Sequence, residues 1–241
     1  MDKLKDYQIL IVGVVFSLSI LLCVYIALQT LSRNGIDVTG SAEEIIKSDR
    51  AVWKIEVTTQ EPTKVEAFNK LKKHIDLVQK YLIEQGIKPE EIEALNTNSY
   101  PVYKLDLKTG RNTNEVEYYV FSQIYQITSN NIDKIKELSI NAEALLSKGI
   151  DVKSFPPNYF YSKLDELKPQ LLQAATKNAK VRAEAMLSNT GNKVGAIQSA
   201  KSGVFQITQV DSTEVSNYGI HDTSSIDKKV TAVVQAKFKI K

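Results

Sequence analysis

The first hydrophobic pattern in the chain is an uninterrupted apolar segment near the N-terminus. No charged residue occurs from position 7 to position 32, and positions 9–22 are almost continuously aliphatic. A helix over residues 7–28 would rise about 33 Å, enough to cross a hydrocarbon core of about 30 Å. Because a backbone in lipid must satisfy its own hydrogen bonds, a helix is the form expected there. The pattern predicts one transmembrane helix with limits near Tyr7 and Leu28.

Three kinds of export segment are consistent with such an N-terminus. A cleaved signal peptide needs a shorter apolar core and a small-x-small site, and residues 27–31 make a poor site. A lipoprotein needs a small residue before its cysteine, but Leu22 precedes Cys23. An uncleaved signal anchor fits best. Lys3 and Lys5 precede the segment and Arg33 follows it, so residues 1–34 predict a cytoplasmic tip and a single-pass inner-membrane anchor, with the main domain periplasmic or extracellular.

Residues 35–241 change to patterns typical of a globular domain. Residues 52–59 alternate, with Trp53, Ile55 and Val57 on one face, as in a half-buried strand. A helix with apolar positions spaced by three and four then runs from Pro62 to a stop at Gly86. An extended segment at 92–107, a turn and a long strand at 116–128 follow. Residues 52–128 therefore predict one strand–helix–hairpin unit.

The same order of elements recurs after a linking helix at 132–148. An extended segment at 152–162 precedes an alanine-rich helix at 164–189 and two further strands at 196–210 and 230–240. The helix stops Gly86 and Gly191 lie 105 positions apart. We therefore predict an α+β fold with internally duplicated β-helix-β-β units, the second over 152–241. Hairpin connections imply one antiparallel sheet with helices packed on one face. We interpret 35–241 as one domain rather than two.

The long strand at 116–128 is apolar on both faces. A strand with one solvated face should alternate apolar and polar residues, so something must cover the second face. A helix or loop of the same chain is one explanation, and a neighbouring subunit is the other. The candidate oligomer interface consists of the residues on that second face, namely Tyr119, Phe121, Tyr125 and Ile127.

Two polar hairpin connections, 108–115 and 211–228, occupy equivalent places in the two units. The second is too long for a plain hairpin, and long loops are often used for contacts. We expect at least one of them to join subunits. The candidate contact loop contributes Asp211, Tyr218, His221 and Asp222.

Composition narrows the functional classes. Apolar residues make up 43% and charged residues 24%, with a net charge of +3. This balance is ordinary for a globular protein, and it predicts no nucleic-acid partner. A disulfide within the chain and a cysteine-based zinc site are excluded because Cys23 is the only cysteine. His74 and His221, the two histidines, have no partners at metal-ligand spacing, and no phosphate or dinucleotide motif occurs. We expect no cofactor and no enzymatic activity.

Several short segments, in this order and spacing, resemble the SIMPL domain (DUF541) family of bacterial periplasmic and envelope proteins. They are residues 38–41 (VTGS), 66–69 (EAFN), 92–97 (IEALNT), 101–103 (PVY) and 179–185 (AKVRAEA). The resemblance covers about 36–241. It implies a duplicated α+β fold, export from the cytoplasm, and a large hollow homo-oligomer as in a structurally known relative, a periplasmic immunogenic protein. It also implies a link to oxidative-stress defence.

Together these observations predict a membrane-anchored, extracytoplasmic, non-enzymatic protein. We expect it to assemble with itself into a ring or hollow cage, with a role in envelope or oxidative-stress protection implied by the resemblance alone. Its expected partners are further copies of the chain and the lipid bilayer. The alternative is a monomeric or dimeric tethered module that binds an envelope protein or peptidoglycan. An enzyme with an unrecognised site is a third interpretation.

Overall fold

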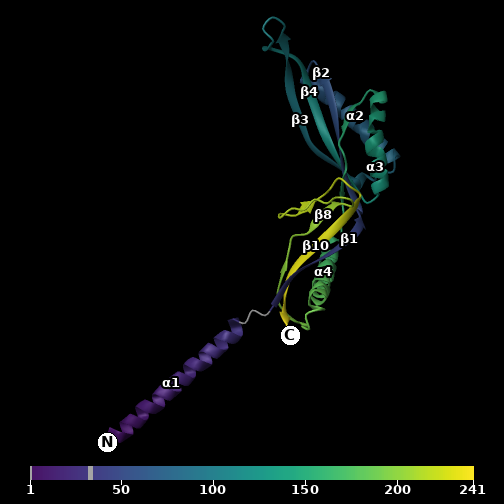
Figure 1. Cartoon of the computed structure of the whole chain (residues 1–241). Coiled ribbons are helices and arrows are strands. Elements are labelled where there is room, and N and C mark those ends of the chain that lie inside the picture. The colour runs from purple at the N-terminus through teal and green to yellow at the C-terminus, as the bar shows by residue number, and fades with distance from the viewer. Residues whose placement is uncertain (1, 32–34) are drawn as a thin grey trace. The chain divides into compact units, whose positions relative to one another are not determined.

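A computed structural model describes residues 2–31 and 35–241, and in the N-terminal helix it describes side chains for residues 11–26 only. The chain divides into two compact units (Figure 1). The larger unit contains residues 42–172 and 204–232, and the smaller contains residues up to 41, 173–203 and 233–241. Three elements contribute residues to both units: β1 (Gly35–Lys47), α4 (Leu164–Leu187) and β10 (Asp227–Ile240).

The larger unit is built on a five-stranded antiparallel sheet. Its strands follow the order β3 (Ile92–Asp106), β4 (Arg111–Ser129), β2 (Arg50–Glu61) and β5 (Asp151–Ser154), and β6 (Asn158–Phe160) also pairs with β2. The register places Trp53 opposite Ile127 and Ile55 opposite Tyr125. The predicted alternation of residues 52–59 is confirmed, because Trp53, Ile55 and Val57 are all fully buried.

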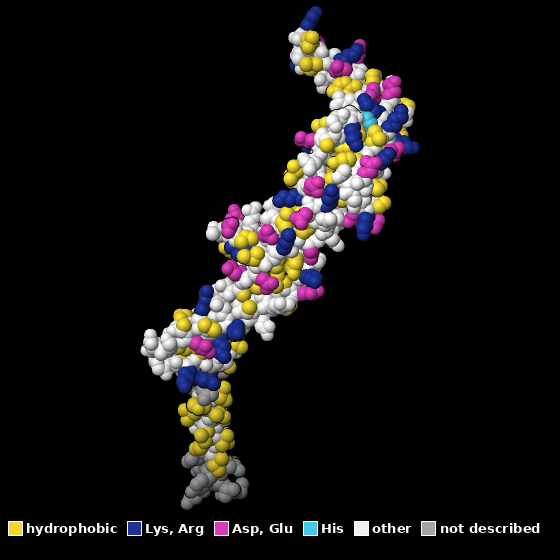
Figure 2. Space-filling model, turned by 90° about the vertical axis from the view of Figure 1, so that its right-hand side faces the viewer, with side chains coloured by type: hydrophobic (Ala, Val, Ile, Leu, Met, Phe, Trp, Pro, Cys, Tyr) yellow, Lys and Arg dark blue, Asp and Glu magenta, His cyan; other side chains and the backbone are white. Residues whose placement is uncertain are grey.

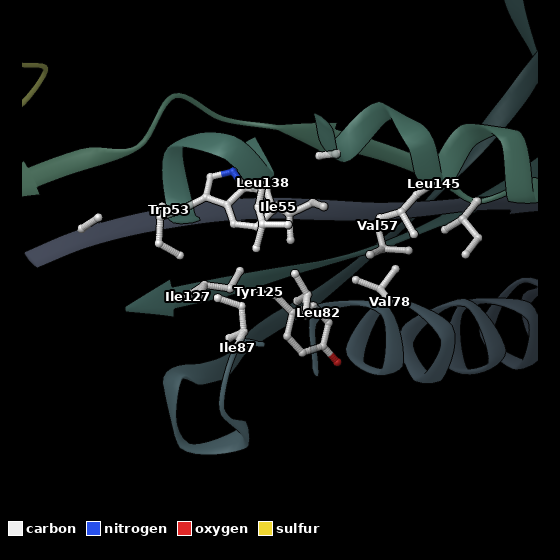
Figure 3. Close-up of a cluster of buried hydrophobic side chains, with 14 of the residues drawn as sticks. Trp53, Ile55, Val57, Val78, Leu82, Ile87, Tyr125, Ile127, Leu138 and Leu145 are labelled. Carbon is white, nitrogen blue, oxygen red and sulfur yellow. The ribbon is translucent and has the colours of Figure 1, made fainter. Parts of the chain in front are cut away.

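Two helical segments cover one face of this sheet. The helix α2 (Lys64–Glu84) begins after Thr63, whose hydroxyl accepts a hydrogen bond from the Glu66 amide, and Gly86 follows it with φ +90°. The helix α3 (Ile132–Asn141) continues as the 3₁₀ helix η2 (Ala142–Lys148). A short 3₁₀ helix, η1 (Pro89–Glu91), leads into β3. Figure 3 shows side chains of α2, α3 and η2 converging on those of β2 and β4 in one apolar core.

A second five-stranded sheet has the order β1-β10-β8-β9, and β7 pairs with β10. Its remaining strands are β7 (Val194–Ser202), β8 (Gln206–Gln209) and β9 (Ile220–His221). β10 alternates between buried and half-exposed positions along its length. In the smaller unit α4 packs closely on β1, because a Cβ at Gly40 would overlap the backbone of Ala175 and Ala179. The small residues predicted for this helix therefore permit a close approach of helix and strand.

The α+β class is confirmed, and the expectation of one sheet is corrected to two. The sequence assigns 152–162 to the first strand of the second unit. Instead, the segment breaks around Pro156 and Pro157 into β5 and β6, and both pair with β2. Besides β7 and β8, β10 pairs with β1, which begins at residue 35. The internal duplication stays a prediction.

The N-terminal segment forms the helix α1 (Asp2–Leu31). Tyr7 and Leu28, the predicted limits of the anchor, lie in this helix, and their side chains are outside the described residues. Met1 and residues 32–34 are also outside them. When only the described residues are considered, no helix is long and apolar enough to cross a membrane.

Candidate functional site

The predicted interface residues on β4 lie against α2 of the same chain. Tyr125 and Ile127 are buried in the core of the larger unit. Phe121 meets Phe68 edge to face, with ring centroids 6.0 Å apart. The Lys64 ammonium lies 5.4 Å from the centroid of the Tyr119 ring. Tyr125 and Ile127 therefore offer no surface to a second chain, and of the two explanations for this apolar face, a helix of the same chain is the one observed.

Tyr125 also ties the sheet to α2 through its hydroxyl. Gln79 Nε2 donates a hydrogen bond of 3.3 Å to the Tyr125 hydroxyl oxygen. Burial raises the pKa of this phenol above its ordinary value. Tyr125 thus remains neutral at physiological pH and serves the fold.

A two-stranded arm extends beyond the end of β2. Pairing between β2 and β4 ends at Glu61 and Tyr119, whereas β3 and β4 continue pairing to Asp106 and Arg111 (Figure 1). The arm carries Leu105 and, at its turn, Leu107, which is 91% exposed. These leucines were not among the predicted site residues. The sequence does contain a signal for them, because an apolar residue beside the turn of an otherwise polar hairpin is unusual.

The charged side chains on the face shown in Figure 2 do not form a patch that would indicate a binding site. Figure 2 shows Lys and Arg side chains interleaved with Asp and Glu side chains rather than gathered into a patch of one sign. Among the described residues, no group of three or more His, Cys, Asp or Glu side chains is placed to hold a metal ion. The polar side chains that come together in the larger unit lie instead in its loops and cavities.

The first part of the predicted contact loop is held in a defined conformation. Gln206, a buried residue of β8, donates from Nε2 to the Ser216 carbonyl oxygen at 2.7 Å and accepts from the Ser216 amide at 3.4 Å. Lys229 Nζ donates to the Ser212 carbonyl oxygen at 3.0 Å. Between and beside these anchors the loop presents Val215, 81% exposed, and Tyr218, 98% exposed.

The second part of the loop is organised by Asp222. Its Oδ1 accepts from the Ser224 amide at 2.9 Å and the Ser224 hydroxyl at 2.6 Å. Its Oδ2 accepts from the amide and hydroxyl of Ser225. Lys228 Nζ lies 3.4 Å from Oδ2 and donates to the Asp222 carbonyl oxygen at 2.7 Å. Sequence reasoning placed Asp222 in a contact loop, whereas its carboxylate is turned inward.

The ionisation of this pair follows from its surroundings. Burial by itself would raise the pKa of Asp222, but hydrogen bonds from Ser224 and Ser225 and the charge of Lys228 hold it well below its ordinary value. Burial lowers the pKa of Lys228, and Asp222 opposes that shift. Asp222 is therefore a carboxylate at neutral pH.

Lys228 is a central residue that sequence reasoning missed. Positions up to 228 were interpreted as a polar loop, but β10 begins at Asp227. Lys228 lies on the same buried face as Val230 and Ala232. Extending the alternation of the last strand backward by two residues would have found it.

A cavity of the larger unit lies beside this loop. It has a volume of about 610 Å³, and its lining includes Asp133, Asp211, Asp227, Lys47 and Lys136. Cations and carboxylates thus face the same space. Asp211, a predicted contact residue, belongs here, while His221 and Asp222 line a separate cavity of about 270 Å³.

The smaller unit has a polar cavity of its own. It measures about 360 Å³ and lies on strands β1, β7 and β10. Lys237 Nζ and Asp37 Oδ2, both on its lining, lie 3.7 Å apart. Lys201 and Ser199 of β7 complete a hydrogen-bonding surface without aromatic residues.

These features define the class of protein as an α+β domain with ordered loops and polar cavities. A comparison with protein families matches residues 36–238 to SIMPL, described as a protein of unknown function (DUF541). The chain therefore belongs to the SIMPL family, which confirms the resemblance drawn from the sequence. A comparison with curated proteins finds no match.

Proposed function

We propose that this chain is a membrane-tethered, extracytoplasmic and non-enzymatic protein that assembles with copies of itself. The observation that carries the proposal is the ordered loop whose anchors at Ser212 and Ser216 present Val215 and Tyr218 to solvent. Aromatic side chains are favoured at interfaces. A loop already fixed by hydrogen bonds loses little conformational entropy when it binds.

A second surface suited to self-association is the arm formed by β3 and β4. Leu105 and Leu107 are exposed on the two-stranded ribbon that extends beyond the end of β2. An apolar tip of this kind gains free energy when a partner removes it from water. Two separate contact surfaces on one chain also allow closed rings to form rather than simple dimers.

The apolar N-terminal segment supports the membrane tether. All described side chains of α1, those of residues 11–26, are exposed, including Ile11, Phe16 and Leu21. A helix that is apolar on every side is suited to lipid rather than to one face of a domain. Anchors on many subunits would bind one membrane with high avidity. Lys3 and Lys5 favour an N-terminus in the cytoplasm and a domain outside it.

The test is the mass of the full-length protein in a mild neutral detergent, measured by light scattering after size exclusion. We expect a defined oligomer for the wild type and a smaller species for the double variant Val215→Ser, Tyr218→Ser. Glu214→Gln, which changes an exposed polar residue of the same loop, should leave the mass unchanged. A monomeric wild type would refute self-assembly.

One observation favours a tethered binding module as the second candidate. The 610 Å³ cavity exposes both lysines and aspartates, so it suits a zwitterionic ligand such as a peptide of an envelope protein or of peptidoglycan. Saturable binding of soluble peptidoglycan fragments to a monomeric protein would support this candidate. Loss of that binding in Asp211→Asn together with Lys136→Gln would locate the ligand in the cavity.

We also propose that the chain contains an internal duplication. In each sheet a long strand, β4 or β10, pairs antiparallel with an earlier strand, β3 or β7, although β8 and β9 lie between β7 and β10 along the chain. A long helix, α2 or α4, precedes that earlier strand in both cases, with the short η1 between α2 and β3. The matching order supports two related units whose first strands differ.

A further inference from the structure

A small cavity in the larger unit brings together strands that are far apart in sequence. Its volume is about 120 Å³. Six different strands contribute to its lining: Ile46, Arg50, Ile207, His221 and Lys228 come from β1, β2, β8, β9 and β10, and Tyr159 and Phe160 both come from β6. Since a water molecule occupies about 30 Å³, the space suits a ligand of only a few heavy atoms.

The polar side chains around the cavity can all donate hydrogen bonds. Arg50, His221 and Lys228 line it together with Tyr159 and Tyr161, and no Asp or Glu does. The carboxylates next in sequence to lining residues are engaged elsewhere. Asp49 accepts from the amide and hydroxyl of Ser162, and Asp222 accepts from Ser224 and Ser225. Asp165 pairs with Lys168, and Asp227 lines the separate 610 Å³ cavity. The lining therefore favours an anion.

Two of these cations retain hydrogen-bonding capacity. The Arg50 guanidinium lies 5.4 Å from the centroid of the Phe160 ring, and it makes no hydrogen bond or ion pair with the described residues. Its planar fork of donors matches a carboxylate. The Lys228 side chain is only 3% exposed, and its ammonium donates to two oxygens of Asp222, which leaves one of its three protons for a ligand.

The aliphatic side chains that line the rest of the cavity favour some anions over others. Ile46, Leu164 and Ile207 are aliphatic. A sulfate or phosphate would place some of its oxygens against these side chains without hydrogen-bond partners, which is unfavourable. A carboxylate with a short alkyl chain would place its oxygens near Arg50 and Lys228 and its carbons against the aliphatic walls. We propose that this cavity binds a small monocarboxylate.

The test uses the full-length protein in a neutral maltoside detergent, with sodium propionate as the probe and sodium chloride at equal ionic strength as the reference. Isothermal titration and saturation-transfer NMR should show saturable binding and contact with the propionate methyl group. Arg50→Gln should weaken the affinity about tenfold or more, because a charge-assisted bidentate bond is lost. Arg50→Lys keeps the charge but not the planar fork of donors, so its affinity for propionate should lie between those of the wild type and Arg50→Gln.

Arg111→Gln is the matched control, since Arg111 is an exposed arginine of the same unit at the start of β4. It should bind propionate as the wild type does. The proposal is overturned if no saturable binding occurs, if Arg50→Gln binds as well as the wild type, or if sulfate and phosphate bind equally tightly. Should Arg50→Gln fail to fold, Arg50→Lys decides in its place: unweakened binding would refute the proposal. None of these outcomes depends on the oligomeric state.

Discussion

Lys228 and Asp222 form an ion pair that is shielded from water. The side chains are 3% and 12% exposed, and the Lys228 ammonium both donates to the Asp222 backbone carbonyl oxygen and faces its carboxylate. The pair closes the connection between β9 and β10, because Ser224 and Ser225 bind the same carboxylate. One aspartate therefore fixes the path of the chain into the last strand.

Asp222→Asn should destabilise the larger unit by about 3 kcal/mol, because it leaves the Lys228 charge buried without its counter-ion. Urea unfolding followed by circular dichroism would measure this loss. Asp211→Asn, at an exposed position at the other end of the loop, should change the stability by less than about 0.5 kcal/mol. Equal effects of the two substitutions would contradict the role of the ion pair.

The same pair predicts a pH dependence of stability with a definite sign. The folded pKa of Asp222 lies below its ordinary value. Its contribution is therefore fully present above the unfolded pKa of about 4 and is lost as the pH falls from there toward the folded pKa. The difference in stability between the wild type and Asp222→Asn should shrink below about pH 4. A difference that stays constant from pH 6 to pH 2.5 would refute this linkage.

The parts of the fold predicted correctly are those decided by local patterns. Trp53, Ile55 and Val57 follow a strict period of two, and α2 and α4 follow helical spacing with glycine stops. The pairing of β1 with β10 could not be read from the sequence, since it joins segments nearly two hundred positions apart. The pattern of residues 152–162 is compatible with pairing to the edge of any sheet. It therefore could not show that these residues pair with β2.

The candidate site was predicted only in part for a related reason. The loop 211–228 was identified from its length and polarity, but these properties do not show which polar side chains turn inward. Lys228 resembles a solvated lysine until β10 is known to begin at Asp227. Similarly, the double apolar face of β4 indicates that something covers it, and only the packing of α2 shows what does.

Ser154→Ala should destabilise the larger unit by about 1–3 kcal/mol and alter the tryptophan fluorescence. The buried Trp53 Nε1 donates to the Ser154 hydroxyl at 3.0 Å, which donates to the Ser139 carbonyl oxygen at 2.8 Å. Removing the hydroxyl takes away the acceptor of the buried Trp53 Nε1–H. Because Trp53 is the only tryptophan, its emission reports this site alone. Ser147→Ala, at an exposed serine, should leave the emission unchanged.

Gly40→Ala should destabilise the smaller unit by about 3 kcal/mol, because a Cβ there would overlap backbone atoms of Ala175 and Ala179 that cannot rotate away. Thermal unfolding would measure the loss. Gly203→Ala is the control in the same unit, since its Cβ would meet Val233 only at ordinary contact distances of 3.4 and 3.7 Å. A Gly40→Ala variant as stable as Gly203→Ala would show that α4 and β1 are not packed as described.

Gln206→Ala should release the loop that carries Val215 and Tyr218, because both hydrogen bonds to the Ser216 backbone are lost. Hydrogen exchange measured by mass spectrometry should be faster in peptides covering residues 211–219, while peptides of β2 keep their protection. Gln209→Ala is the matched control on the same strand, since Gln209 makes only a long contact of 3.5 Å to Ser224.

The same Gln206→Ala variant tests whether assembly requires the loop to be ordered or only requires Val215 and Tyr218 to be exposed. A flexible loop must lose more conformational entropy on binding, so we expect weaker self-association than in the wild type although Val215 and Tyr218 are still present. Light scattering at decreasing protein concentration would detect the earlier dissociation. If exchange in 211–219 accelerates but the oligomer dissociates at the wild-type concentration, the loop does not form the contact, and the β3–β4 arm becomes the surface to mutate.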